Sequence, residues 1–305
     1  MAEPLLPDEA FWDGVFGPLL HLLASGGGRR ISVGGLGGAA LPLAVAAVHR
    51  LAGPTMVIAP GAREAESIRD DLATLLPGPV LHFPSHETLP FHGEEAHQGV
   101  TADRVECMAG LLKGDGGTLV VVPAPALIKR IPLPGEFPFL KLYEGMRLVP
   151  EALGDWLLAA GFRRETGVFE QGRWSRRGGV VDVGSYGRSN PVRIEFRDDQ
   201  VESLRLFDPQ SQRSVRSLRE VVLIPARELF LTPEHWNRAL DALPPEHPLE
   251  ERLSGSFDFP GIEHYVPLFF KETGTILDYL PAIGTLVLLE PERIEASVEA
   301  ALEAR

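Results

Sequence analysis

The sequence has little cysteine, no long apolar run and no excess of positive charge. Its one cysteine, Cys107, excludes an intramolecular disulfide and disfavours a thiolate zinc site, which fits a reducing, cytoplasmic compartment. No apolar stretch approaches the length of about 18 residues that a membrane-spanning helix needs. The first residues also lack the basic segment of a signal peptide, so we expect a cytoplasmic protein without a membrane span.

The charge balance is acidic. The 29 Lys and Arg residues and the 42 Asp and Glu residues give a formal net charge of −13. Phosphate backbones attract a clustered positive field, so this balance argues against a general nucleic-acid-binding surface. With 305 residues, of which 44% are hydrophobic and 23% charged, the chain is long enough for two or three soluble globular domains.

The first part of the chain alternates helical and strand-like segments. Helices are predicted over 8–25, 39–51, 62–76 and 101–113, and strands over 30–33, 56–60, 80–84 and 118–123. This alternation is typical of right-handed βαβ units and a parallel sheet. Near the end of the chain, a strand over 284–290, expected to be buried, and a helix over 292–305 resemble one more unit of the same sheet.

A β-rich stretch over 172–228 interrupts this α/β pattern. Apolar residues at 192, 194 and 196 alternate with charged residues at 193, 195 and 197, which is the period of a half-buried strand. Asp198 and Asp199 predict a turn, and the residues from 201 to 207 return as a hairpin partner. We therefore predict an α/β domain in two parts, 1–138 and 227–305, with an inserted β-rich α+β domain over 139–226.

Arginines are concentrated in this β-rich stretch. The group comprises Arg173, Arg176, Arg177, Arg193 and Arg197, with Trp174 beside them. Arg and Trp are enriched among interface hot spots, and Arg binds carboxylates through two parallel hydrogen bonds. The group predicts a protein-docking surface. The alternatives are an ordinary solvated strand face and a DNA footprint, whose affinity would fall steeply with salt.

A glycine-rich segment lies where a phosphate-binding loop is expected, between a predicted strand and a predicted helix. Such a loop needs a lysine for the phosphates and a serine or threonine for Mg²⁺. Gly34, Gly37 and Gly38 keep the glycine pattern, but Ala40 replaces the lysine and Leu41 replaces the Mg²⁺ ligand. The pattern therefore favours a tight turn that binds no nucleotide.

The predicted strand over 284–290 carries only part of a Walker B element. A Walker B strand ends in an acidic pair that binds Mg²⁺ and orients water. Here Glu290 supplies one carboxylate, and its neighbour is Pro291. We therefore predict a degenerate P-loop NTPase or helicase-like domain that is not an enzyme, hydrolyses no ATP and needs no cofactor. An active helicase fragment is the alternative, and Ala40 and Leu41 argue against it.

No other residue group indicates catalysis or metal binding. A proline-containing segment carries the histidines His82, His86, His92 and His97. They have no cysteine partners and no helical pair spacing, so we expect no metal there. Cys107, Phe269 and Phe270 are predicted to pack in the core.

Several segments together resemble a known family. The order of an α/β lobe, an inserted β-rich domain and a second α/β piece is similar to the nucleotide-excision-repair helicase UvrB. The more specific resemblance is to the UvrB-like N-terminal module of bacterial transcription-repair coupling factors (Mfd), which the degenerate Walker elements also favour. The matching segments span nearly the whole chain and are 83–91, 97–98, 177–182, 191–196, 207–213, 223–228 and 261–270.

The resemblance implies a partner and the residues that bind it. In this family the inserted domain docks onto UvrA and so recruits repair proteins to a stalled RNA polymerase. The family's UvrA-contacting arginines correspond to Arg177 and Arg193. A third contact, an aromatic side chain, corresponds to Arg197, so this chain departs from the family there.

The resemblance also implies that the chain is a fragment. Full-length members continue with a domain that binds RNA polymerase and with a translocase motor that binds DNA and uses ATP and Mg²⁺. They keep the UvrA-binding surface packed against their C-terminal region until activation.

Overall fold

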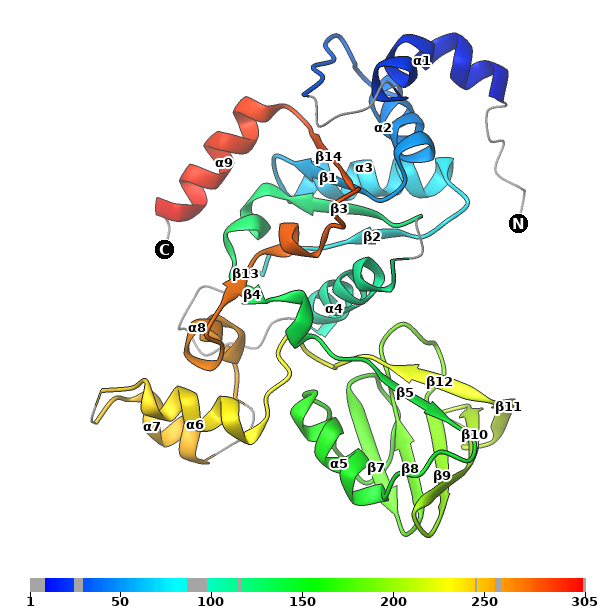
Figure 1. The fold of residues 1–305 in the computed structure, drawn as a ribbon, viewed down its shortest axis with the longest axis vertical. Coiled ribbons are helices and arrows are strands. Elements are labelled where there is room, and N and C mark those ends of the chain that lie inside the picture. Colours follow the sequence, from blue (N-terminus) through cyan, green and yellow to red (C-terminus); the bar gives the residue numbers. More distant parts are fainter. Residues whose placement is uncertain are drawn as a thin grey trace. The chain divides into compact units, whose positions relative to one another are not determined.

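The computed structural model describes residues 9–24, 30–86, 98–114, 117–244, 246–255 and 259–303 (Figure 1). The chain forms two compact units. Unit 1 contains the described residues of Met1–His86, Cys107–Lys129 and Ile276–Arg305, and unit 2 those of Glu87–Glu106 and Arg130–Thr275. Within the described ranges, no helix is long and apolar enough to cross a membrane.

Unit 1 is built on a parallel sheet with the strand order β14-β1-β3-β2. Its strands are β1 (Thr55–Ala59), β2 (Val80–His82), β3 (Leu119–Pro123) and β14 (Thr285–Leu288). Every residue of β1 and β3 is buried. Continuous apolar runs are typical of central parallel strands, because both faces of such a sheet are covered. The predicted parallel sheet, split around an inserted β-rich part, is confirmed.

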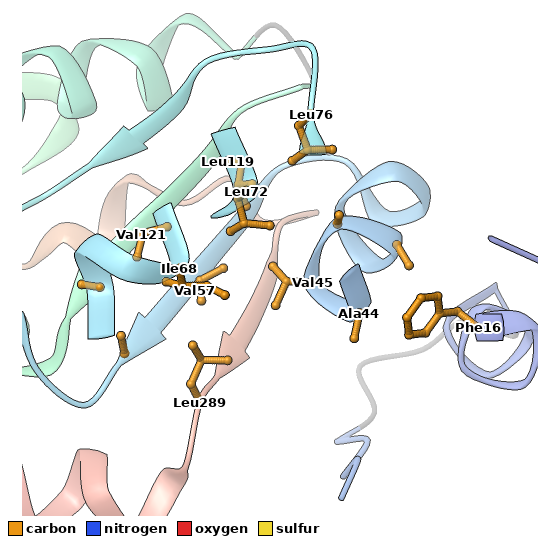
Figure 2. Packing of buried hydrophobic residues seen from close by; sticks show 14 of the residues in the cluster. Phe16, Ala44, Val45, Val57, Ile68, Leu72, Leu76, Leu119, Val121 and Leu289 are labelled. Atoms are coloured by element: carbon orange, nitrogen blue, oxygen red, sulfur yellow. The ribbon is translucent and has the colours of Figure 1, made fainter. Parts of the chain in front are cut away.

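Helices cover this sheet and form its main core. They are α1 (Glu9–Ala24), α2 (Ala40–Ala52), α3 (Ala62–Leu75) and α9 (Pro291–Glu303), together with the end of α4 (Gln98–Lys113). Figure 2 shows Val57 and Val121 of the sheet packed with Val45 of α2 and Ile68 of α3. Phe16 of α1 packs onto the outer side of α2 (Figure 2). The chain therefore holds α1 through aromatic and aliphatic contacts with α2.

Two strand predictions in unit 1 are wrong in detail. Residues 30–37 form no regular structure, and Val33 is 50% exposed. A strand needs a neighbour to pair with, and residues 30–33 pair with no strand in the described part of the chain. β14 exists, but it is an edge strand with Leu286 and Leu288 exposed, whereas the sequence predicted a buried strand.

Unit 2 contains a larger, mostly antiparallel sheet with the order β11-β10-β9-β8-β7-β6 (Figure 1). Its strands are β6 (Arg163–Arg164), β7 (Arg173–Arg177), β8 (Val180–Val183), β9 (Val192–Arg197), β10 (Gln200–Phe207) and β11 (Ser214–Leu218). Asp198 adopts a positive φ of 55° in the turn between β9 and β10. The antiparallel pairing of β9 with β10 confirms the predicted hairpin. Asp suits this turn because it tolerates the left-handed region better than most residues.

One face of this sheet is covered by α5 (Pro150–Ala159). Gly154 lacks a side chain at the contact, and a Cβ there would lie 3.2 Å from Cη2 of Trp174. Val181 and Ile194 are fully buried on the same face of the sheet. Short paired strands accompany the main sheet and are β5 (Leu140–Tyr143) with β12 (Glu220–Leu223) and β4 (Ile131–Pro132) with β13 (Thr273–Gly274).

A helical cluster completes unit 2. It contains α6 (Pro233–Asp241), α7 (Leu249–Gly255) and α8 (Val266–Phe269). Phe269 and Phe270 are 0% and 3% exposed in its core, as predicted. Cys107 is also buried, as predicted. Only Ile276–Arg305 return to unit 1, and residues 227–275 belong to unit 2. The domain boundaries given above remain a prediction, because compactness alone does not define a domain.

A buried ion pair joins α4 to the segment that follows β12. Nε of Arg104 lies 2.7 Å from Oε1 of Glu228, and its Nη2 lies 2.7 Å from Oε2. The two side chains are 0% and 3% exposed. Burying a charge costs free energy unless the charge is paired. Each of these two side chains therefore lowers the cost of burying the other.

Removing one charge of this pair is expected to destabilise the fold strongly. Glu228→Gln should lower the free energy of unfolding by about 3–5 kcal/mol, because Arg104 stays buried and loses the charge of Glu228. The double variant Arg104→Met with Glu228→Leu should regain much of this loss. Urea denaturation measures both.

The exposed pair of Lys141 and Glu220, at 2.8 Å, provides the matched control. Glu220→Gln should change the free energy of unfolding by less than about 1 kcal/mol. The interpretation fails if Glu228→Gln costs no more than Glu220→Gln.

Candidate functional site

The strand register divides the predicted arginine group between two faces of the sheet. Asp182 is opposite Arg193, and Arg193 is opposite Arg205. Since side chains alternate along a strand, Arg173 and Arg177 of β7 lie on this same face. We call it the arginine face, defined by Arg173, Arg177, Arg193, Arg197 and Arg205.

Trp174 and Arg176 do not belong to the arginine face, which corrects the sequence-based grouping. Trp174 is 3% exposed and packs against α5. Nη2 of Arg176 donates to Oε1 of Glu151 on α5 at 2.6 Å. This hydrogen bond is the main reason why the pKa of Glu151 is lowered. Both residues serve the packing of α5, and neither is presented with the other arginines.

Arg193 is fixed at the centre of the arginine face. Its Nε and Nη2 donate to the two carboxylate oxygens of Asp182 at 2.8 and 2.9 Å. Nη2 also donates to Oε1 of Gln212 at 3.1 Å. The guanidinium lies over the ring of Phe207, 4.5 Å from its centroid. The hydrogen bonds to Asp182 raise the pKa of Arg193, so its charge is permanent.

Three further arginines of this face also have carboxylate partners. Arg173 lies 3.0 Å from Glu165, and Arg205 lies 3.0 Å from Glu195. Arg197 pairs with Glu202 across the β9–β10 hairpin. These pairs are partly or largely exposed, so each contributes little to stability. Their effect is to compensate most of the positive charge of the face locally.

Arg177 is the exception on this face. It is exposed, and its Nη2 donates to the carbonyl oxygen of Thr166 at 3.2 Å. Within the residues that the structure describes, no carboxylate pairs with Arg177. A backbone carbonyl holds the side chain in place without neutralising it. Arg177 therefore offers an exposed and oriented positive charge.

Gln212 and Phe207 were not identified as site residues from the sequence. Phe207 is the last residue of β10. Gln212 lies in the loop between β10 and β11 and has a positive φ of 59°. Ser211 N donates to Oδ1 of Asp208 at 2.6 Å, which lowers the pKa of Asp208. The Asp208-Pro209 dipeptide is the signal that could have predicted this turn. The contact of Gln212 with Arg193 depends on strand pairing, so it could not be predicted from the local sequence.

The glycine-rich segment of unit 1 leads into α2, and two backbone amides at this start are hydrogen-bonded within the chain. Phosphate-binding loops point free backbone amides at the phosphate from the start of a helix. Here Ala40 N donates to Gly37 O at 3.2 Å, and Leu41 N donates to Gly38 O at 3.4 Å. Gly38 has a φ of 55°, and Gly34 comes before it in the irregular segment. The amides at the start of α2 are thus already engaged.

Glu290 also has a partner that competes with a metal ion. It follows β14 with a positive φ of 51°, and both its carboxylate oxygens lie 3.1 Å from Nη1 of Arg293. Nη2 of Arg293 reaches Glu64 on α3. These hydrogen bonds raise the pKa of Arg293 and make it a permanent counter-charge.

The histidines considered as metal ligands are only partly described. His82 ends β2 and is buried, and His86 lies in the segment after it. His92 and His97 lie outside the described residues. In the described ranges, no group of three or more His, Cys, Asp or Glu side chains could hold a metal ion.

Known proteins resemble this chain over most of its length. The family described as "UvrB interaction domain" matches residues 140–229, which include the arginine face. The transcription-repair-coupling factor of Escherichia coli (strain K12) is 32% identical over 273 residues, covering 85% of this chain and 24% of that protein. The factor of Myxococcus xanthus is 32% identical over 275 residues, covering 83% and 23%.

A relative with lower identity gives the same result. The transcription-repair-coupling factor of Bacillus subtilis (strain 168) is 28% identical over 272 residues, covering 81% of this chain and 23% of that protein. The chain thus spans about a quarter of the length of the curated relatives that it matches. We conclude that the chain is homologous to part of the bacterial transcription-repair-coupling factors and contains a UvrB interaction domain.

Proposed function

We propose that the arginine face docks onto UvrA and that the protein thereby recruits UvrA to a stalled RNA polymerase in transcription-coupled nucleotide excision repair. The observation that carries this proposal is Arg177, an exposed and oriented guanidinium that pairs with no carboxylate among the described residues, on an otherwise compensated face. Arg binds a partner's carboxylate through two parallel hydrogen bonds, which gives both affinity and orientation.

The rigidity of the face supports a docking role. Arg193 is held by Asp182, whose side chain is 5% exposed, and by Gln212. Side chains that are ordered before binding lose less entropy when a partner immobilises them. Arg193 and its partners on the arginine face are therefore already ordered before UvrA binds.

Reversing one charge of the arginine face should weaken docking strongly. We expect Arg177→Glu and Arg193→Glu to weaken UvrA binding by about 2–4 kcal/mol, because each places a carboxylate where the partner presents negative charge. Isothermal titration calorimetry of the 305-residue chain with purified UvrA measures this. Arg177→Glu is the cleaner variant, since Arg193→Glu sets a second carboxylate against Asp182 and its fold must be checked by circular dichroism.

Arg216→Glu is the matched control. Arg216 is exposed on β11 of the same sheet, but it is opposite Leu206 and so lies on the other face. This variant should bind UvrA like the wild type. The assignment of the arginine face is wrong if all three variants bind alike, and the docking proposal is wrong if the wild-type chain does not bind UvrA.

We also propose that the chain neither binds nor hydrolyses ATP. The engaged amides of Ala40 and Leu41 and the ion pair of Glu290 with Arg293 support this. Phosphoryl transfer depends on cationic groups that stabilise the charge of the transition state, and this segment provides neither a lysine nor a hydroxyl.

Addition of Mg²⁺-ATP should leave the thermal unfolding midpoint unchanged, because a ligand stabilises only a fold that binds it. Phosphate release should equal that of a buffer blank. The control is Arg293→Ala, which frees Glu290 and should still show no ATP hydrolysis. A stabilisation that increases with the concentration of ATP, or phosphate release above the blank, would contradict the proposal.

A further inference from the structure

Phe169 is a large apolar side chain that lies largely in water. It belongs to the loop between β6 and β7, and 64% of its surface is exposed. Single exposed apolar side chains are common on protein surfaces and need no functional explanation. Phe169 differs from this usual case in the order of its loop and in its neighbour.

The loop that carries Phe169 is fastened on both sides of it. The preceding residue, Val168, is 1% exposed. The carbonyl oxygen of the following residue, Glu170, lies so close to Gly184 that a Cβ there would overlap it. Gly172 N donates to the carbonyl oxygen of Gly184 at 2.7 Å. The backbone is thus ordered while the ring points outward, which lowers the entropy lost when a partner covers the ring.

The Phe169 ring lies near the guanidinium of Arg177, which pairs with no carboxylate in the described part of the chain. The two side chains meet at Gly167. A Cβ on Gly167 would lie 3.1 Å from Cε2 of Phe169 and 3.7 Å from Nη2 of Arg177. That same Nη2 is anchored to Thr166 O. The ring and the charge are therefore presented side by side from one short loop and the end of β7.

We propose that Phe169 and Arg177 act as one contact point, with the ring entering an apolar depression of the partner and the guanidinium binding a carboxylate at its rim. Aromatic residues and Arg are enriched at the buried centres of protein interfaces. Carboxylates pair with most arginines of this face and weaken its attraction for a phosphate backbone, which is why we assign the contact to a protein. The inference rests on the proposed docking of UvrA and adds to it a residue on which the affinity depends.

Calorimetry of the 305-residue chain with purified UvrA tests this contact. Phe169→Ala should weaken binding by about 10- to 100-fold, the range of a central hot spot. Phe169→Leu should keep most of the affinity, since it retains an apolar side chain. Tyr143→Ala is the matched control, because Tyr143 is a 48% exposed aromatic residue on β5, outside the main sheet of unit 2. It should bind like the wild type.

Two further readouts separate contact by the ring from a general effect on charge or folding. The loss caused by Phe169→Ala should be the same at low and high ionic strength, whereas the loss caused by Arg177→Glu should shrink as salt screens the charge. The heat-capacity change of binding should also be less negative in Phe169→Ala, because less apolar surface is buried.

The outcomes distinguish this inference from the proposed function. If the wild type binds UvrA, Arg177→Glu does not, and Phe169→Ala binds like the wild type, the docking proposal stands and the role of Phe169 is wrong. If Tyr143→Ala weakens binding as much as Phe169→Ala, the effect is not specific and the inference is also wrong. If the wild type does not bind UvrA, the proposed function fails and the inference fails with it.

Discussion

The buried pair of Arg104 and Glu228 is the constraint on which the order of unit 2 depends. Two charges that are 0% and 3% exposed must remain together in the folded state. The segment that contains Glu228 is also bonded to the end of α5, since Ala226 N donates to Ala160 O and Leu231 N to Ala159 O. The pair therefore locks the exit of the inserted β-rich part against both α4 and α5. Fixed in this way, α5 supports the packed face of the main sheet, and the arginine face lies on the opposite side.

The arginine face contains two kinds of arginine, which differ in their partners. Arg193 donates to Asp182 and Gln212 and stacks on Phe207, so most of its hydrogen-bonding capacity is satisfied within the chain. Arg177 is held by one carbonyl oxygen and retains its full charge. The first kind of arginine fixes the shape of the surface, and the second offers the surface to a partner. Order achieved before binding lowers the entropy that association must overcome.

The alternation of apolar and charged residues along 192–197 correctly predicted a strand and the side on which Arg193 and Arg197 lie. The same alternation, applied to 173–177, separates Trp174 and Arg176 from Arg173 and Arg177. The placement of Trp174 and Arg176 on one surface with the other arginines was wrong, because it grouped residues by closeness in sequence. Other features depend on distant partners that no local pattern contains. Residues 30–33 are strand-like but pair with no strand among the described residues, and Arg104 and Glu228 are 124 positions apart. The missing lysine of the glycine-rich segment was evident from the sequence, but the engagement of its amides was not.

The distribution of charge determines what kind of partner this face suits. A chain of net charge −13 repels nucleic acid at long range, and pairing with carboxylates weakens the local field of Arg173, Arg193, Arg197 and Arg205. Little attraction is left at distances beyond contact, so recognition has to arise at short range. At short range the face presents Arg177 beside the exposed ring of Phe169. That combination matches a carboxylate at the edge of an apolar depression, which a protein surface offers and a phosphate backbone does not.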